Sequence, residues 1–545
     1  MSEKSVPTTA IDSSRTRERN WLQLSLLVIA VSVPYVNSFA VPFTFDDLRN
    51  IANNPEIRHL WPRPAESNYT HYRRPVGRHT FALNYWWGRQ EVWGYHAVNL
   101  AIHLAAACLL MMLVNDALSD ERNASSWRKA AGSLALAAAL IWAIHPLQTQ
   151  SVTYIVQRFE SLSALFLLGT LWLLARGTRA AVAWPWYVGS LVAYSLGIAT
   201  KETAGAIPLV ALLFDRSFLS RSWSEVLSRR WGYYLGFLPA IIWFFTRFEA
   251  PQGDLATLSK GLGWWEYFRS QPGVILYYLR LVVWPDQLCL DYNWPIATNW
   301  WTIAACGIPL LVLLGASCIG LFRWPRLGFL GLAFFLTLAP SSSIVPIADL
   351  AYEHRMYLPL APLTILTVLV LYQVCNWLCR TELQSVRAMM AIICILALLL
   401  GARTWQRNRD WANPRKLWES NVAIAPQSYR AQANLAMILR EAGETERAIS
   451  HLQKSIAIKP TAVAYRNLGL IHRDRRELDQ AEKCFLRALQ DRPSYAPASL
   501  DLARLFSESQ KWPQAVSYFQ ATLALEPKSP IDIIDRAAVL DELGS

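Results

Sequence analysis

Several patterns that define common protein classes are missing from this chain of 545 residues. Its 8 cysteines lie mostly in or beside apolar runs, and Cys375 and Cys379 do not form a CxxC pair. We therefore predict neither a disulfide framework nor a zinc site. No GxGxxG follows a predicted strand, and no nucleic-acid-binding motif accompanies the net charge of +12. These absences exclude a Rossmann-type nucleotide site and leave nucleic acid without support as a partner.

Long apolar runs dominate the chain as far as residue 400, in keeping with its 53% hydrophobic residues and 25 tryptophans. We predict about eleven membrane spans, a number that follows from the length needed to cross a bilayer. They lie at 21–39, 95–116, 131–147, 160–175, 183–199, 204–215, 232–247, 302–322, 327–340, 357–375 and 387–402. The predicted organisation is a tail over 1–20, a membrane domain over 21–403 with a first external loop at 40–94, and a polar C-terminal part over 404–545.

Basic residues in the short loops predict the orientation of these spans. Lys4, Arg15, Arg17 and Arg19 place the N-terminus in the cytoplasm. An odd number of spans then puts 404–545 on the other side. This count treats 270–284 as an interfacial helix, because that stretch is short and contains Tyr277, Tyr278 and Arg280.

The C-terminal part contains an internal repeat. Pro426, Pro460, Pro493 and Pro527 are separated by 34, 33 and 34 residues, by subtraction of their positions. This spacing is the tetratricopeptide period. One unit has the matching small and large apolar positions, at Leu468, Gly469, Ala481, Phe485 and Ala488. We predict an α-solenoid whose groove binds a polypeptide; a generic scaffold or a dimer surface is the alternative.

Two adjacent acids, Asp46 and Asp47, follow the first span. A carboxylate at a membrane face can act as general base toward a hydroxyl, and a neighbouring acid raises its pKa or helps to hold a metal. The simpler reading is a helix N-cap on a solvated loop. The same loop contains several arginines, including Arg74, which are suited either to gripping a phosphate or to binding lipid headgroups.

An ordered set of short segments resembles one family, the transmembrane and tetratricopeptide-containing O-mannosyltransferases of the GT-C class. The segments are Phe45-Asp46-Asp47, Tyr72-Arg73-Arg74-Pro75, Trp93-Gly94-Tyr95-His96, His145-Pro146-Leu147-Gln148, Arg158-Phe159-Glu160, Lys201-Glu202-Thr203 and Glu353-His354-Arg355-Met356-Tyr357. The resemblance covers nearly the whole chain. It departs from the family at Gln150, where an acidic residue is frequent, and in the shorter repeat array. The implied fold is all-α: a polytopic GT-C membrane domain followed by a tetratricopeptide solenoid.

The resemblance implies an inverting glycosyltransferase that moves a sugar from a polyprenyl-phosphate carrier to a protein Ser or Thr hydroxyl. Asp46 matches the family's base, with Asp47 beside it as a second catalytic candidate. A departing lipid phosphate needs cations or donors, and the candidates are Arg74, Arg158, Lys201, Arg355 and Tyr357. Supporting site residues are His145, Glu160, Glu202 and Glu353. No cofactor is required for a monophosphate donor, whereas a divalent metal, Mg²⁺ or Mn²⁺, is expected if the donor is a lipid diphosphate.

The expected partners are thus a polyprenyl-phosphate sugar, membrane lipid and an acceptor protein bound by the repeats. The expected location is a bacterial inner membrane with the site and the repeats on the periplasmic face, or the endoplasmic reticulum with lumenal repeats if the protein is eukaryotic. Two other classes stay open: a non-enzymatic membrane scaffold or assembly factor, and a flippase for lipid-linked glycans. An anchor would not need acids and arginines on several external loops, and a flippase would need polar groups inside its spans.

Overall fold

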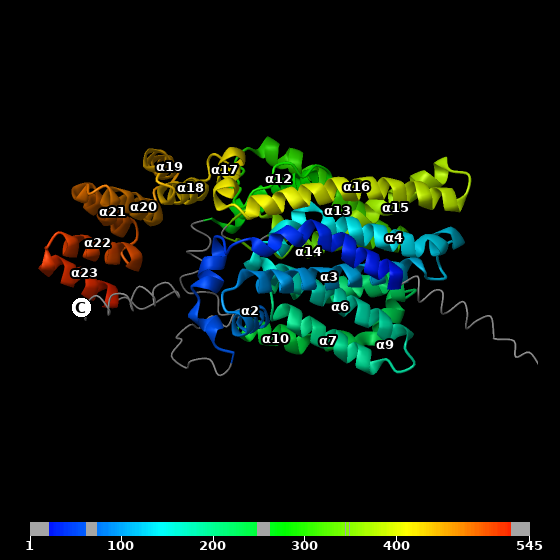
Figure 1. The fold of residues 1–545 in the computed structure, drawn as a ribbon. Coiled ribbons are helices and arrows are strands. Elements are labelled where there is room, and N and C mark those ends of the chain that lie inside the picture. The colour runs from blue at the N-terminus through cyan, green and yellow to red at the C-terminus, as the bar shows by residue number, and fades with distance from the viewer. Residues whose placement is uncertain (1–20, 61–73, 248–261, 344, 348, 525–545) are drawn as a thin grey trace, which may run out of the picture.

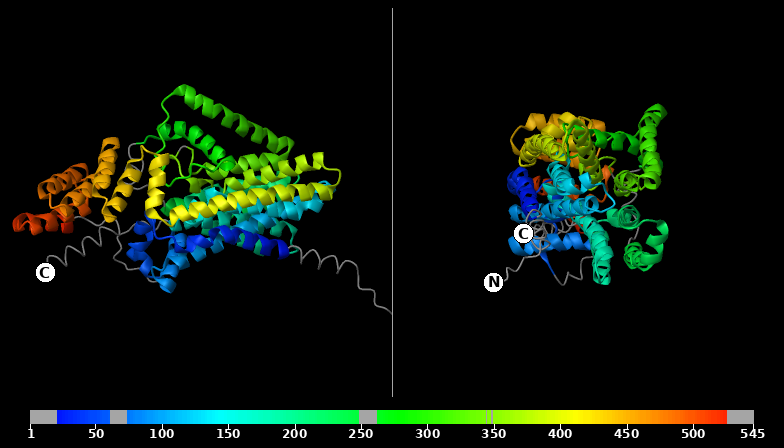
Figure 2. Two further views of the ribbon diagram at one scale, coloured as in Figure 1. Left: turned by 45° about the horizontal axis from the view of Figure 1, so that its top comes forward. Right: turned by 90° about the vertical axis from the view of Figure 1, so that its right-hand side faces the viewer.

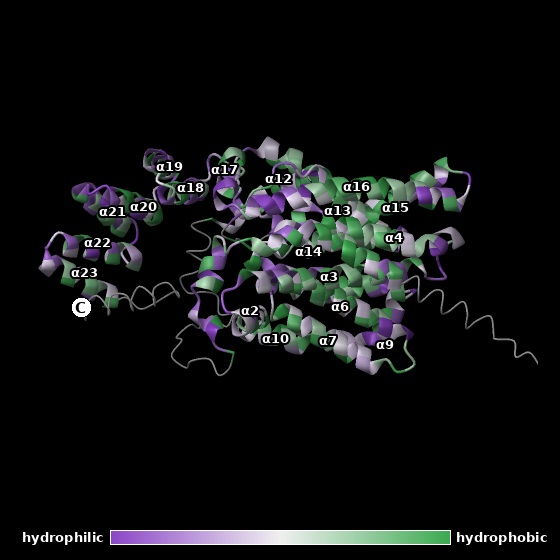
Figure 3. Cartoon of the chain, viewed as in Figure 1, coloured by the Kyte–Doolittle hydropathy of each residue, from purple (hydrophilic) through white to green (hydrophobic). Residues whose placement is uncertain are grey.

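The computed structural model describes residues 21–60, 74–247, 262–343, 345–347 and 349–524, and these contain helices and no β-strand. Figure 1 shows a bundle of long helices with a separate stack of short helix pairs at one end. Apolar residues cover the middle of the bundle, and polar ones gather at its two ends and on the stack (Figure 3). The all-α prediction is therefore confirmed.

Seven helices in the described ranges are long and apolar enough to cross a membrane. They are Trp21–Ala40, which ends in the 3-10 segment η1 (Val33–Ala40), α3 (Val92–Leu118), α4 (Ser125–Ile144), Ile155–Arg179, which comprises η5 (Ile155–Gln157) and α6 (Arg158–Arg179), α13 (Trp300–Arg323), α15 (Leu360–Leu378) and α16 (Glu382–Trp411). The protein is thus a multi-pass membrane protein.

The other predicted spans correspond to shorter or interrupted helices. They are α7 (Trp184–Ile198), α8 (Ile207–Phe214) between η6 (Glu202–Ala206) and η7 (Asp215–Leu219), the pair α9 (Trp223–Leu235) and α10 (Leu238–Arg247), and α14 (Pro325–Leu338). Several pack against a longer neighbour: α7 lies along α6, and α14 lies between α13 and α15, whereas α9 contacts the shorter α8. The total of eleven spans stays a prediction.

The stretch at 270–284 belongs to a longer helix, α12 (Trp264–Val283), which lies near the repeat end of the bundle (Figures 1 and 2). Its tyrosines bond to nearby loops: the Tyr267 hydroxyl donates to the Ser341 carbonyl at 2.5 Å, and Tyr278 to the Tyr352 carbonyl at 2.8 Å. Trp264 and Trp265 are exposed, as expected for side chains at a membrane interface. The interfacial placement of this helix stays a prediction.

Short helices fill the end of the bundle where the repeats begin. They are η2 (Leu48–Ala52), η3 (Pro55–Arg58), α2 (Pro75–Gly88), η4 (Pro146–Gln148), α5 (Thr149–Val152) and η8 (Glu353–Met356). At the opposite end, ion pairs join the loops that are rich in basic residues, such as Lys129 with Glu382 at 2.9 Å and Arg179 with Asp116 at 3.2 Å. The two ends of the bundle therefore differ, and the polar loop set predicted as external lies beside the repeats.

The predicted tetratricopeptide repeats are present as antiparallel helix pairs (Figure 2). They are α18 (Tyr429–Glu441) with α19 (Thr445–Ile458), α20 (Ala462–Asp474) with α21 (Leu478–Asp491), and α22 (Ala496–Glu508) with α23 (Trp512–Ala524), preceded by the single helix α17 (Pro414–Ile424). Gly469 shows why a small residue is needed, because a Cβ there would come within 2.7 Å of the Phe485 ring. The sequence also predicts the start of a capping helix at Pro530–Leu543, which lies outside the described residues.

One hydrophobic core joins the repeats to the membrane domain. It contains Val41 and Ile51 of the first external loop together with Trp411, Leu417 and Leu435 of the junction and first repeat. Two ring pairs cross this junction: Tyr154 stacks on Trp411 with centroids 5.2 Å apart, and Phe45 meets Trp418 edge-on at 5.7 Å. Because buried interfaces of this kind resist separation, the first repeat has a fixed position above the loop that contains Asp46 and Asp47.

Candidate functional site

Asp46 lies on a turn directly below the first repeat. Its main-chain N–H donates to the Tyr154 hydroxyl at 2.9 Å, and the residue is partly exposed. Phe45, just before it, has a φ of 53°, a left-handed conformation that is rare for a bulky side chain. Such strained positions cluster at functional sites. Burial raises the pKa of Asp46, whereas the Tyr154 hydroxyl and the charge of Arg430 lower it.

Asp47 has a different environment from its neighbour. Its carboxylate is buried and accepts two main-chain hydrogen bonds, from Thr44 at 3.1 Å and from Val156 at 2.7 Å. Burial raises its pKa to about 8 against the opposing effect of these bonds. Because both oxygens are used to tie the first loop to the segment before α6, the geometry favours a structural role and leaves Asp46 as the base candidate.

A second wall of the site comes from the segment around η8. The Tyr352 and His354 rings stack with centroids 5.0 Å apart. His354 is held by Gln150, whose Oε1 accepts from the His354 main-chain N–H at 2.7 Å and lies 2.9 Å from its ring Nδ1. Burial lowers the pKa of His354, and the charges of Lys201, Arg355 and Arg74 lower it further. His354 is therefore a neutral imidazole close to the cations expected to receive a phosphate.

Two predicted cations, Arg74 and Lys201, lie together in this region, each with an acid. Lys201 pairs with Glu160, and both side chains are about nine-tenths buried, at 10% exposure each. Arg74 pairs with Glu202, with its Nε 2.9 Å from Oε2, and this pair is more exposed, at 33% and 44%. Burial opposes the ionisation of Glu202, but Arg74 outweighs it and lowers the pKa to about 2. The structure thus brings together Arg74, Lys201, Glu160 and Glu202, as the sequence predicted.

Arg158 is not placed to receive a ligand phosphate. Its guanidinium is fully buried and donates to Asn99 Oδ1 and Asn84 Oδ1, both at 2.6 Å, and to the Tyr95 carbonyl at 2.9 Å. It also lies over the Phe81 ring, 4.5 Å from the centroid. These hydrogen bonds connect α2 and α3 to α6, so Arg158 has a structural role and the prediction that it binds the donor phosphate is corrected. The contacts that decide this cannot be read from the sequence.

Arg355 and Tyr357 are also occupied by the protein itself. Arg355 donates to the Leu350 carbonyl at 2.8 Å, the Asp349 carbonyl at 2.6 Å and the Tyr267 hydroxyl at 3.1 Å. It therefore shapes the loop before η8. Tyr357 is buried, with its hydroxyl 2.7 Å from His103 Nδ1. Both side chains are thus engaged by protein groups, which favours a structural role for each.

The two other supporting residues, His145 and Glu353, are buried in the protein as well. His145 accepts from the Leu147 main-chain N–H at 3.2 Å, and its Nε2 lies 3.0 Å from the Val282 carbonyl. Glu353 accepts from the Tyr292 hydroxyl at 2.8 Å, and burial raises its pKa. Both hold the segments at this end of the bundle in place.

Four residues at the site were not predicted: Tyr154, Asp291, Asp349 and Arg430. Tyr154 bonds to Asp46, while Arg430, in the first repeat, reaches both acids, with its Nη2 2.6 Å from Asp291 Oδ1 and its Nη1 3.1 Å from Asp349 Oδ2. The two acids lie in loops predicted to be external and could have been noticed for that reason. Nothing in the sequence pointed to Arg430 as a site residue, because it lies in a repeat helix far along the chain.

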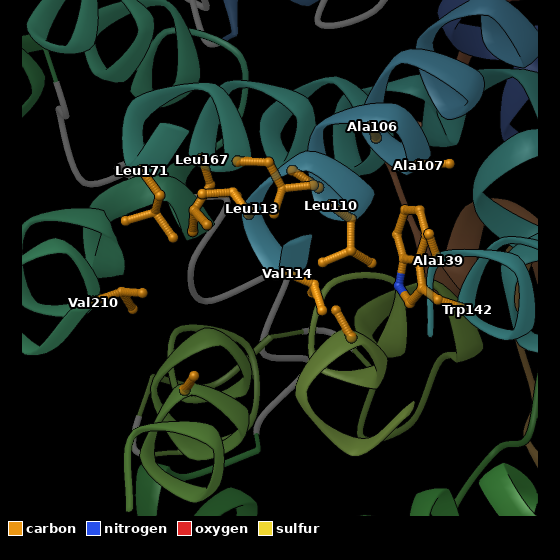
Figure 4. Close-up of a cluster of buried hydrophobic side chains, with 14 of the residues drawn as sticks. Ala106, Ala107, Leu110, Leu113, Val114, Ala139, Trp142, Leu167, Leu171 and Val210 are labelled. Atoms are coloured by element: carbon orange, nitrogen blue, oxygen red, sulfur yellow. The ribbon is translucent and has the colours of Figure 1, made fainter. Parts of the chain in front are cut away.

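An apolar cavity of about 340 Å³ lies among the spans and extends toward the end of the bundle opposite the repeats, where its lining includes Asn123 and Arg326. Figure 4 shows Leu110, Leu113, Val114, Leu167, Leu171 and Val210, which are among its lining residues. Its walls are α3, α6, α8, α14 and α15. Three of these helices also connect to the polar end of the bundle. Glu160 lies in the first turn of α6, Lys201 precedes α8 in the chain, and His354 precedes α15. The cavity and the cations are thus built on shared elements.

Among the residues that the structure describes, no group of three or more His, Cys, Asp or Glu side chains could hold a metal ion. Asp291 and Asp349, two acids at this end of the bundle, are instead bridged by the Arg430 guanidinium. The predicted metal requirement of a diphosphate donor stays a prediction.

Fold and site together define a multi-pass helical membrane protein whose polar site lies at the end of the bundle next to a tetratricopeptide array. Family models agree with this division. A model described as dolichyl-phosphate-mannose-protein mannosyltransferase matches residues 125–247, and tetratricopeptide repeat models match residues 429–461 and 466–530.

Among curated proteins, the chain is similar to protein O-mannosyl-transferases. It is 26% identical to one from Caenorhabditis elegans over 80% of this chain and 63% of the relative. It is 24% identical to Tmtc3 of Drosophila melanogaster, covering 90% and 61%, and 24% identical to human TMTC1, covering 83% and 57%. The chain therefore spans about three-fifths of the length of these relatives. The resemblance inferred from the motifs is confirmed.

Among solved structures, ArnT from Cupriavidus metallidurans bound to undecaprenyl phosphate matches 87% of this chain and 80% of its own. The identity is 16% and the TM-score is 0.40.

Proposed function

We propose that the protein is a membrane glycosyltransferase that moves mannose from a polyprenyl-phosphate carrier to a Ser or Thr hydroxyl of an acceptor protein. The observation that supports this most is the position of Asp46, a partly exposed carboxylate at the polar end of the bundle. It bonds to Tyr154 and lies at the same end as the Arg74 and Lys201 pairs. The similarity to protein O-mannosyl-transferases supports the same reaction class.

In the proposed step, the acceptor oxygen attacks the anomeric carbon while its proton passes to an Asp46 oxygen. The bond between the anomeric carbon and the phosphate oxygen breaks, the electron pair leaves with the lipid phosphate, and the configuration inverts. A general base of this kind contributes about 10²–10⁴-fold to the rate. Its raised pKa makes Asp46 a stronger base than an ordinary aspartate, provided that the pH is high enough to ionise it.

The phosphate is expected at Arg74, with Lys201 beside it. Exposed ion pairs contribute about 1 kcal/mol or less, so Arg74 can exchange Glu202 for a phosphate at small cost. Lys201 is buried with Glu160, and separating that pair would cost more. Lys201 therefore supplies a nearby positive charge instead of a direct contact. Arg158 and Arg355, which are buried and bonded to protein groups, are left out of the phosphate site.

The apolar cavity suits the isoprenoid chain of the donor. Its lining is formed mainly by leucine, valine, alanine and phenylalanine, with Asn123, Arg326 and Thr337 among the few polar residues. Burial of apolar surface of this kind stabilises a lipid chain. Such a lining offers no polar path for a sugar headgroup, which argues against the flippase. The acceptor protein is expected to bind along the tetratricopeptide groove.

The decisive experiment measures sugar transfer from polyprenyl-phosphate mannose by purified wild type, Asp46→Asn and a matched control, Asp120→Asn. Asp120 lies at the opposite end of the bundle, where it pairs with Arg122. We expect Asp46→Asn to lose at least about 100-fold in rate while it folds normally. The control should keep wild-type activity. Full activity of Asp46→Asn, or no transfer by wild type, would contradict the proposal and favour a scaffold.

The side of the membrane is also a proposal. The basic loops pair at one end of the bundle and the repeats lie at the other, so the site and array should face the periplasm or the lumen. Protease added outside spheroplasts should cut within 404–545. Protection of this part would contradict the assigned orientation.

A further inference from the structure

Arg430 extends from the first repeat into the membrane domain. It is the second residue of α18, yet its guanidinium bonds to acids on two separate loops of the bundle. Its Nε and Nη2 lie 2.8 Å and 2.6 Å from the two oxygens of Asp291, and its Nη1 lies 3.1 Å from Asp349 Oδ2. The Ser428 hydroxyl, at the start of α18, also donates to Asp291 at 2.8 Å. The repeat helix therefore binds both loops at once.

These two loops border the candidate base. Asp349 accepts a hydrogen bond from the Tyr352 hydroxyl at 2.8 Å, and Tyr352 belongs to the site wall described above. The charge of Asp46 contributes to raising the pKa of Tyr352, and Asp349 and Arg430 act on Asp46 in turn. Arg430 is thus the cation among three acids, Asp46, Asp291 and Asp349.

We propose that Arg430 is a positioning residue of the transferase site, supplied by the tetratricopeptide array, which holds the Asp291 and Asp349 loops around Asp46 and keeps that base in its ionised form. The proposal rests on the proposed role of Asp46. It gives the first repeat a part in catalysis besides docking an acceptor. Removing the cation would leave Asp291 and Asp349 without their shared partner and Asp46 without a compensating positive charge, and nearby like charges favour protonation.

A purely structural role makes a different prediction. Loss of a structural ion pair lowers stability but leaves the pH profile of the remaining activity unchanged. Loss of a positioning cation raises the pKa of the base, so the acid limb of the profile moves to higher pH. The groups that act on the Asp46 carboxyl are Tyr154, Arg49, Arg430, Asp349 and Asp47. Of these, Arg430 is the charged group contributed by the array.

The test uses the full chain in lipid nanodiscs and measures transfer from polyprenyl-phosphate mannose as a function of pH. Arg430→Gln should move the acid limb upward by about one pH unit, the smaller end of the shift caused by a nearby opposite charge. Arg430→Lys should restore part of the shift. Arg440→Gln is the matched control, because Arg440 lies on the same helix and pairs with Asp474 at 2.6 Å within the array.

A double variant, Arg430→Gln with Asp349→Asn, guards against misfolding. It removes one acid with the cation, and the acid limb should return toward its wild-type position. The proposal is overturned if the pH profile of Arg430→Gln coincides with those of wild type and Arg440→Gln. It is also overturned if the acid limb of the double variant does not move back toward its wild-type position. Either result leaves the transferase intact if wild type is active and Asp46→Asn is not. Failure of those two controls would instead overturn the proposed function and this inference with it.

Discussion

Asp47→Ala should loosen the first external loop without touching the base beside it. The Asp47 carboxylate accepts the main-chain N–H groups of Thr44 and Val156 in a buried position. A buried donor left without a partner costs about 1–3 kcal/mol. Two such donors, partly satisfied by entering water, give a loss of about 2–4 kcal/mol in the free energy of local opening. Because about 1.4 kcal/mol is a factor of ten, hydrogen exchange in this loop should be about 30-fold faster or more.

The assay is hydrogen exchange followed by mass spectrometry on peptides covering 41–54 and 152–160. Asp46→Ala is the matched control, since the bond that Asp46 donates to Tyr154 uses the main chain and survives truncation of the side chain. We expect wild-type exchange in the control and fast exchange in Asp47→Ala. Equal exchange in the two variants would refute the structural assignment of Asp47, and loss of transfer with unchanged exchange would return it to catalysis.

Three further outcomes are expected. Burial raises the folded-state pKa of Asp47 to about 8, so its contribution to stability is complete at acid pH and is lost as the pH rises from about 4, the ordinary aspartate value, through 8. Exchange of the loop, corrected for the intrinsic pH dependence of amide exchange, should therefore quicken up to pH 8 and level off above it in wild type, and should stay flat in Asp47→Asn. Arg158→Lys should lower the thermal melting temperature in detergent and leave the affinity for the sugar donor unchanged, because the Arg158 guanidinium bonds to protein groups. Weaker binding of the sugar donor with an unchanged melting temperature would contradict this. Gly469→Val should destabilise the repeats by about 1–3 kcal/mol, because the new side chain would overpack against Phe485. An unchanged midpoint of urea unfolding would show that Phe485 can move aside without cost and would contradict this.

The sequence by itself determined those features that depend on local pattern. The length and hydropathy of apolar runs identify spans because each stretch must satisfy the bilayer alone. The repeat of Pro426, Pro460 and Pro493 identified helix pairs because every unit has the same packing need. The motif segments also placed Asp46, Arg74 and Lys201 at one end of the bundle, since the end of a span determines which face its loop occupies.

Tertiary structure alone decided which of these polar residues are available for chemistry. Asp46 and Asp47 are adjacent and identical in type, yet Asp47 accepts a main-chain bond from Val156, 109 positions away. Arg158 is enclosed by partners on α2 and α3, and Arg430 meets Asp291 across 139 positions. Burial and hydrogen-bond partners arise from such long-range contacts. They determine the cost of moving a charge, and so distinguish a base or a phosphate ligand from a structural clamp.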